Sequence, residues 1–121
     1  MNRIYHNPRC SKSRCALQLL QDSGVEIETI PYLETPPSVR ELDEICRQLG
    51  VEPTALVRTK ERRFKELGLN LSDNRSRQEW LEVMSTNPVL IERPIFVTGD
   101  RAVIGRPPEK VIELLQSENG L

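Results

Sequence analysis

The first thirty residues predict two strands joined by a helix, and this unit limits the possible folds more than any other feature of the chain. Residues 3–7 have the pattern of a short strand, and residues 11–22 that of a helix that stops at Gly24. Apolar and acidic residues alternate over residues 25–29, as in a strand with one face toward water. A strand–helix–strand unit of this length favours two parallel strands, and therefore an α/β fold.

Two capping boxes predict that the middle of the chain is helical. The first begins at Ser38, with Glu41 three residues later, and the second begins at Ser76, with Glu79 three residues later. Each box is followed by apolar residues at helical spacing. We therefore expect a helical insert from about residue 38 to about residue 87.

The last third of the chain predicts a hairpin and a closing helix. Residues 95–98 and 101–104 are strand-like and flank the turn pair Gly99-Asp100. The prolines of Pro107-Pro108-Glu109 favour a helix start, and that helix is expected to run through residue 115.

Together these elements predict an α/β fold of the thioredoxin-like type. Its βαβ and ββα units would share a four-stranded mixed sheet, with the helical insert between them. A chain of 121 residues, 37% hydrophobic and 29% charged, is expected to form one domain over residues 1–121 that buries its own core. Such a fold sets a cysteine at the start of the first helix opposite a proline, here Cys10 and Pro94. The isomer of the Arg93-Pro94 bond stays open, because cis X-Pro bonds are uncommon.

Composition excludes several classes of protein. A net charge of -1 gives no general attraction to nucleic acid, and no apolar run is long enough to cross a membrane. Three cysteines, an odd number with no secretory signal before them, favour a reducing cytoplasm over a disulfide framework. We expect a cytoplasmic monomer that binds no metal and no resident cofactor.

Cys10 is the candidate nucleophile, because it falls where the first strand passes into the first helix. A helix N-terminus and nearby cations both favour thiolate over thiol. Four basic residues come before the first acidic one and should also attract anions: Arg3, Arg9, Lys12 and Arg14. The alternative is a small buried cysteine in a basic surface segment, since one such segment is a weak signal.

Six segments, in order along nearly the whole chain, carry a family resemblance. They are IYHNPRCSKSR at 4–14, YLETPP at 32–37, LVR at 56–58, KELGL at 65–69, NPVLIERPI at 87–95 and IGRPPE at 104–109. In these segments the chain resembles the short form of the glutaredoxin-linked arsenate reductase family.

The resemblance implies roles for individual residues. Cys10 matches the family's nucleophile, and His6 matches a histidine that helps to hold the cysteine as thiolate. Three arginines match an oxyanion site, namely Arg58, Arg93 and Arg106, with Ser11 and Arg14 as secondary candidates. Physical chemistry agrees, because planar guanidinium groups bind tetrahedral oxyanions with paired, charge-assisted hydrogen bonds.

The reaction that the resemblance implies needs a single protein cysteine. Cys10 would attack arsenate, glutathione as reducing co-substrate would reduce the arsenic, and glutaredoxin would remove the glutathione left on Cys10. This agrees with Ser13, which stands three residues after Cys10 where a dithiol motif would have its second cysteine.

Two other functions remain open at this point. A glutathione-dependent thiol reductase with another substrate would share nearly all of these residues. A redox regulator of the same fold, which binds RNA polymerase, would use a Cys-x-x-Cys pair, and Ser13 counts against it.

Simpler structural roles also remain for individual residues. His6 could be a strand-end histidine hydrogen-bonded to the backbone, and each arginine could be a surface residue. Cys15 departs from the family pattern, which has a polar or acidic residue there. We expect Cys15 and Cys46 to be buried as small hydrophobic side chains.

Overall fold

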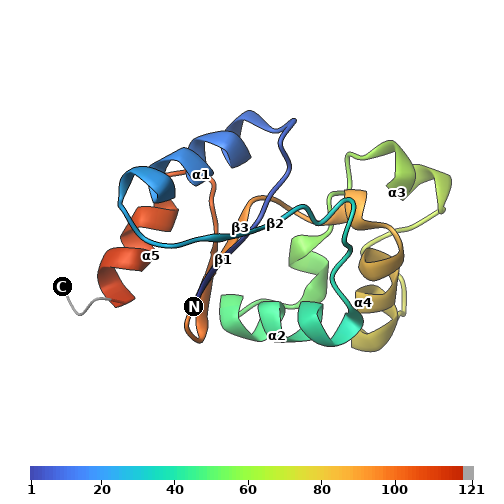
Figure 1. The fold of residues 1–121 in the computed structure, drawn as a ribbon. Coiled ribbons are helices and arrows are strands. Elements are labelled where there is room, and N and C mark those ends of the chain that lie inside the picture. The colour runs from blue at the N-terminus through green and yellow to red at the C-terminus, as the bar shows by residue number, and fades with distance from the viewer. Residues whose placement is uncertain (119–121) are drawn as a thin grey trace. The chain divides into compact units, whose positions relative to one another are not determined.

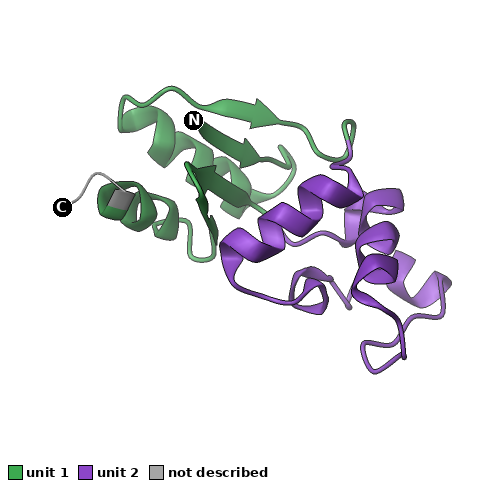
Figure 2. Cartoon of the chain, turned by 90° about the horizontal axis from the view of Figure 1, so that it is seen from below, with its two compact units in different colours: residues 1–35, 93–121 green, residues 36–92 purple. Residues whose placement is uncertain are grey.

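The computed structural model describes residues 1–118, and these form two compact units. Unit 1 is formed by residues 1–35 together with the chain from residue 93 onward, and unit 2 by residues 36–92 (Figure 2). Unit 2 is a few residues wider at both ends than the predicted insert. That both units fold together as one domain stays a prediction.

Unit 1 is built on a mixed sheet of four strands in the order β2-β1-β3-β4 (Figure 1). The strands are β1 (Asn2–Tyr5), β2 (Glu28–Ile30), β3 (Ile95–Thr98) and β4 (Arg101–Ile104). β1 runs parallel to β2 and antiparallel to β3, which pairs in turn with β4 as an antiparallel hairpin. This is the thioredoxin-like arrangement that the sequence predicts.

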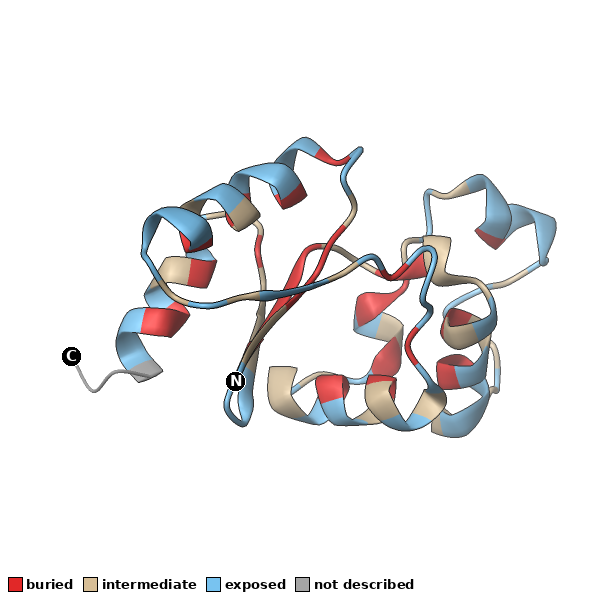
Figure 3. Ribbon diagram, in the orientation of Figure 1, coloured by how far each residue is buried: buried red, intermediate tan, exposed pale blue. Residues whose placement is uncertain are grey.

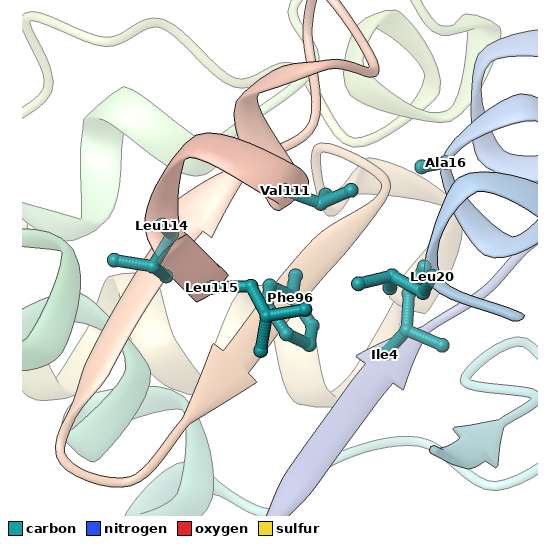
Figure 4. Close-up of a cluster of buried hydrophobic side chains, with 7 residues drawn as sticks. All are labelled: Ile4, Ala16, Leu20, Phe96, Val111, Leu114 and Leu115. Carbon is teal, nitrogen blue, oxygen red and sulfur yellow. The ribbon is translucent and has the colours of Figure 1, made fainter. Parts of the chain in front are cut away.

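Two helices, α1 (Ser11–Asp22) and α5 (Lys110–Glu118), pack against each other in unit 1, and α5 also packs on β3 and β4 (Figure 1). Side chains from β1, β3 and both helices form one hydrophobic cluster (Figure 4), which consists of Ile4, Ala16, Leu20, Phe96, Val111, Leu114 and Leu115. Burial of this apolar surface is the main force that holds the helices on the sheet.

The helix of residues 11–22 and the hairpin are confirmed with their predicted bounds, but other bounds differ. β2 begins three residues later than predicted, and Val25 and Ile27 pack from the preceding loop against the cluster. The last helix begins at Lys110, because Pro107 and Pro108 form a turn whose carbonyls accept from the first helical N–H groups. The alternation of residues 25–29 thus has two sources: Val25 and Ile27 pack on the cluster from a loop, and only residues 28 and 29 belong to the strand.

Unit 2 is helical, as predicted. Its elements are α2 (Val39–Leu49), η1 (Pro53–Leu56), α3 (Arg62–Glu66), α4 (Arg77–Thr86) and η2 (Pro88–Leu90). Both capping boxes are present: Ser38 Oγ accepts from the Glu41 N–H at 3.1 Å, and Ser76 Oγ accepts from the Glu79 N–H at 3.1 Å. Gly50 ends α2 in the left-handed conformation, φ 72°, that favours glycine.

Burial follows the expected faces of these elements. Figure 3 shows buried residues at the end of β1, along β3 and on one side of α1 and α5. Tyr5 and Trp80 are buried. Within the described residues, no helix combines the length and apolar character needed to span a membrane.

Candidate active site

Cys10 is the N-cap residue of α1 and lies on the short connection from β1. Its backbone is extended, with φ -95° and ψ 121°, and its N–H donates to the Asn7 carbonyl at 3.0 Å. Its own carbonyl accepts from the Arg14 N–H at 3.0 Å, the first hydrogen bond of the helix. Cys10 is 8% exposed, so the thiol is largely buried at the positive end of a helix.

The two ends of the hairpin bring two arginines to Cys10. Arg93 precedes β3 and Arg106 follows β4. Arg106 Nη2 lies 3.8 Å from Cys10 Sγ, and its Nε–H donates to the Arg93 carbonyl at 2.9 Å. The charges of both guanidinium groups act on the Cys10 thiol. The structure thus joins three of the predicted site residues from segments far apart in the sequence.

Gly105 allows the chain to pass close to Pro94 just before Arg106. Its N–H donates to the Pro94 carbonyl at 2.9 Å, and a Cβ atom at this position would lie 2.9 Å from Pro94 Cγ and 3.2 Å from Val111 Cγ1. A side chain would force these neighbours apart. The peptide bond between Arg93 and Pro94 is cis, which answers the question that the sequence left open, and the bond between Arg106 and Pro107 is cis as well.

The pKa of the Cys10 thiol is lowered despite its burial. Burial by itself raises the pKa, but the backbone N–H groups of Ser13 and Lys12 and the charges of Arg93 and Arg106 together outweigh it. All four stabilise negative charge on sulfur. The site therefore favours the thiolate, which is the nucleophilic form of cysteine.

His6 interacts with Ser13 in this structure. Its Nδ1 lies 2.7 Å from Ser13 Oγ, and its backbone N–H donates to the Ile30 carbonyl at 2.9 Å. Burial, followed by the positive charge of Arg14, lowers the pKa of His6 and so favours the neutral imidazole. Among the described residues, the side-chain partner of His6 is Ser13 and not the sulfur of Cys10.

The secondary candidates lie at the same helix end. Ser11 is the first residue of α1 and is exposed. Arg14 is also exposed, and its Nη1–H donates to the Pro8 carbonyl at 2.9 Å. Their parts in catalysis stay predictions.

Arg58 belongs to unit 2. It follows an isolated bridge between Val57 and Ile91, and its N–H donates to the Leu90 carbonyl at 2.8 Å. Its guanidinium group is paired with Glu61 and lies 3.9 Å from a carboxylate oxygen of Glu92. The two carboxylates hold Arg58 within unit 2, and its part in an oxyanion site stays a prediction.

The prediction for Cys15 was wrong, whereas that for Cys46 is confirmed. Cys15 is exposed and Cys46 is fully buried. The buried face of α1 is formed by Ser13, Ala16 and Leu20, and Cys15 lies about 100° away from Ala16 around the helix. The sequence pattern could not separate two small neighbouring residues. All three cysteines are free thiols.

Sequence reasoning missed the side-chain role of Ser13. The sequence indicated only that Ser13 replaces the second cysteine of a dithiol motif. In the structure its hydroxyl is fully buried and is hydrogen-bonded to His6 and to the Asn7 N–H. A serine in the first turn of a helix, on the apolar face, was the available signal. Among residues 1–118, no three His, Cys, Asp or Glu side chains gather as metal ligands.

The chain is similar to known proteins over most of its length. Residues 5–114 match the ArsC family. An uncharacterized Escherichia coli protein, YfgD, is 49% identical over 115 residues, which cover 93% of this chain and 95% of that protein. An arsenate reductase of Haemophilus influenzae is 45% identical over a stretch that covers 93% of this chain and 97% of that protein. The solved structure of an arsenate reductase from Vibrio cholerae has a TM-score of 0.86 at 48% identity, and the match covers 93% of this chain and 95% of that one.

Proposed function

The chain belongs to the ArsC family, and from this premise we propose that it is an oxidoreductase that reduces arsenate to arsenite. Relatives of similar length that carry the name arsenate reductase support this substrate. The observation that carries the proposal is a buried cysteine of lowered pKa with the Arg106 guanidinium 3.8 Å from its sulfur. A thiolate beside a guanidinium group is suited to attack on a bound oxyanion.

Arg93 and Arg106 would bind the oxyanion next to the nucleophile. Their charges already act on the Cys10 sulfur, so an anion bound to them would lie within reach of the thiolate. Guanidinium groups that are fixed in advance also stabilise the charge that develops on oxygen as sulfur attacks arsenic. Arg58 is proposed as a third arginine of this site, on the family resemblance alone.

The proposed reaction needs one protein thiol and one external thiol. The Cys10 sulfur forms a bond to arsenic, and one arsenate oxygen leaves as water. A glutathione sulfur then bonds to the Cys10 sulfur, so the two sulfur atoms are oxidised to a mixed disulfide. The two electrons pass to arsenic, which leaves as arsenite in the +3 state. The sum is Cys10 thiol, glutathione and arsenate in, and mixed disulfide, arsenite and water out.

Glutathione and glutaredoxin are proposed as the reducing partners because Cys10 is not part of a Cys-x-x-Cys motif. Ser13 stands where a dithiol motif would have its second thiol, and Cys46 is fully buried in unit 2. A glutaredoxin thiolate would attack the glutathione sulfur of the mixed disulfide and release Cys10 as thiolate. This restores the enzyme for another cycle.

The test is a coupled assay of the purified chain with glutathione, glutathione reductase and glutaredoxin. The measured quantity is the rate of NADPH consumption. We expect arsenate-dependent oxidation of NADPH that requires all three components. A matched reaction with the Arg93→Lys variant should be much slower, since an ammonium group cannot form paired contacts to the oxyanion. No arsenate-dependent rate in the wild-type protein would overturn the proposal.

A second substrate class has one observation in its favour. YfgD, at 49% identity, carries no assigned activity, so close similarity in this family does not always come with the name arsenate reductase. A thiol reductase for glutathione mixed disulfides would need Cys10 but no oxyanion site. The same coupled assay with a small glutathione mixed disulfide separates the two functions, because only arsenate turnover should respond to Arg93→Lys.

A further inference from the structure

The Ser13 side chain is fully buried and has two hydrogen-bond partners, the side chain of His6 and the backbone N–H of Asn7. Ser13 is the third residue of α1 and is 0% exposed. Its Oγ lies 2.7 Å from His6 Nδ1 and accepts from the Asn7 N–H at 3.0 Å. Both partners come from the segment that follows β1. The Ser13 hydroxyl therefore joins the first turn of α1 to the end of that strand.

A serine hydroxyl can donate one hydrogen bond and accept two. Ser13 Oγ accepts from the Asn7 N–H, and it either donates to His6 Nδ1 or accepts from it, according to the tautomer of the imidazole. The lowered pKa of His6 favours the neutral imidazole, which carries its proton on Nε2 when Nδ1 accepts from Ser13 and on Nδ1 when Nδ1 donates to Ser13. In either tautomer this hydrogen bond links the imidazole to the first turn of α1.

The backbone of the same residue acts on Cys10. Among the groups that favour the thiolate, the Ser13 N–H has the largest effect, and the Lys12 N–H contributes as well. Both N–H groups belong to the first turn of α1, whose position depends on what holds it. Asn7 lies at the centre of this arrangement, because it donates to Ser13 Oγ and its carbonyl accepts from the Cys10 N–H at 3.0 Å.

We propose that Ser13 is a positioning residue of the Cys10 site. Its hydroxyl fastens the first turn of α1 to His6 and Asn7, and so keeps the Ser13 and Lys12 N–H groups directed at the sulfur. His6 acts on Cys10 through this hydroxyl, not by direct contact. The inference deepens the proposed function and rests on it in taking Cys10 as the nucleophile.

The experiment measures the rate of Cys10 alkylation by iodoacetamide against pH, with Cys10 followed separately from Cys15 by peptide mapping. In the Ser13→Ala variant we expect the profile to move to higher pH. The rate at neutral pH should fall about three-fold to ten-fold, the effect of one lost hydrogen bond, and recover at alkaline pH. Arg93 and Arg106, the charged groups that face the sulfur from the hairpin, remain in place in this variant.

Ser23→Ala is the matched control. Ser23 Oγ donates to the Leu20 carbonyl at 2.6 Å at the other end of α1, so this variant also removes one serine hydrogen bond from the same helix. Its alkylation profile should match that of the wild type. An unchanged profile in a folded Ser13→Ala protein, or an equal shift in Ser23→Ala, would overturn the proposal.

His6→Phe is a test that does not depend on the Ser13 variant, because it removes the imidazole that pairs with the Ser13 hydroxyl and leaves Ser13 in place. Its profile should move in the same direction. The double variant with Ser13→Ala should move no further than the larger single change, since both act through one hydrogen bond. An unchanged His6→Phe profile, or fully additive shifts, would contradict a path through Ser13.

The alkylation measurement needs no arsenate, so it separates the two proposals. If the profiles shift as expected while the wild-type protein fails to reduce arsenate, the proposed function fails and the role of Ser13 stands. If arsenate is reduced and the profiles do not shift, only the role of Ser13 is overturned.

Discussion

Cys10 in unit 1 and Cys46 in unit 2 are both buried, yet the pKa values of their thiols move in opposite directions. Burial raises the pKa of Cys46 to about 11, and Asp43 and Glu52 add to this while Arg77 opposes it. At Cys10 burial acts in the same direction, but two backbone N–H groups and two arginines overcome it. Burial alone thus makes a cysteine inert, and a helix N-terminus with cations makes it a nucleophile.

The largest difference between the two thiols should appear in catalysis. Cys10→Ser removes the proposed nucleophile, so arsenate turnover should fall by a factor of at least about a thousand. Cys46→Ala and Cys15→Ser should keep most of the wild-type rate, because the proposed reaction uses a single protein thiol and Cys46 is fully buried in unit 2. The coupled assay checks all three variants. Near wild-type turnover in Cys10→Ser would remove the basis of the comparison.

Reactivity of the wild-type thiols should differ nearly as much. With a pKa of about 11, Cys46 is thiolate in only about one molecule in ten thousand at pH 7, and it is also inaccessible. We expect Cys10 to be alkylated with a pKa below the free-cysteine value of about 8.5, and Cys46 only after unfolding. Peptide mapping after timed exposure to iodoacetamide measures both rates. Modification of Cys46 at a rate similar to that of Cys10 in the native protein would contradict the structure.

Arg106→Lys tests whether guanidinium geometry, and not charge alone, distinguishes the Cys10 site. The variant keeps a positive charge but loses the paired contacts to an oxyanion and the fixed hydrogen bond to the Arg93 carbonyl. Arsenate turnover should fall roughly a hundred-fold. Arg101→Lys is the control, because Arg101 is an exposed arginine of the same hairpin that pairs with Ser117. Equal losses in the two variants would argue against a specific role for Arg106.

Stability should depend on pH with opposite sign at the two thiols. The folded pKa of Cys46 is raised from 9.0 to about 11, so its stabilising contribution is complete below pH 9 and is lost as pH rises toward 11. That loss is about 3 kcal/mol and should be absent in Cys46→Ala. The folded pKa of Cys10 is lowered, so its contribution is present above the unfolded pKa and is lost as pH falls through the folded value. Urea unfolding at pH 8 and 10.5 measures the free energy of unfolding of Cys46→Ala and Cys10→Ser against that of the wild type. The same change in this free energy between the two pH values in all three proteins would contradict the prediction.

The smallest effect on stability is expected when one of the charges around Cys46 is removed. Asp43 accepts from Arg47 at 3.1 Å and from Arg77 at 2.8 Å, and these arginines lower the pKa of Asp43. Exposed ion pairs contribute little, so Asp43→Asn should lower the melting temperature by no more than a few degrees. It should also lower the pKa of Cys46, because it removes a negative charge and leaves Arg77. Alkaline titration of the unfolding free energy would detect this shift, and a higher pKa would show that the assigned charges are wrong.

Unit 2 could be predicted from sequence more directly than the site. Ser38 and Ser76 satisfy helix N–H groups within three residues of their own position, so the capping boxes can be recognised from local sequence. The turn at Gly99 is equally local, with φ 59° in the hairpin. Cys15 shows the limit of such patterns, because two adjacent small residues differ in burial only through the direction in which the helix packs.

Local sequence patterns are enough to predict the order of the elements, the place of Cys10 at the first helix N-terminus and, through six short segments, the family. These depend on neighbours along the chain. Three properties of the site and of Cys46 arise only in the folded chain: Arg106 contacts the Cys10 sulfur, Ser13 pairs with His6, and burial raises the pKa of Cys46. Such properties come from charge, hydrogen bonding and burial between residues far apart in the sequence, which exist only after the sheet and helices have packed.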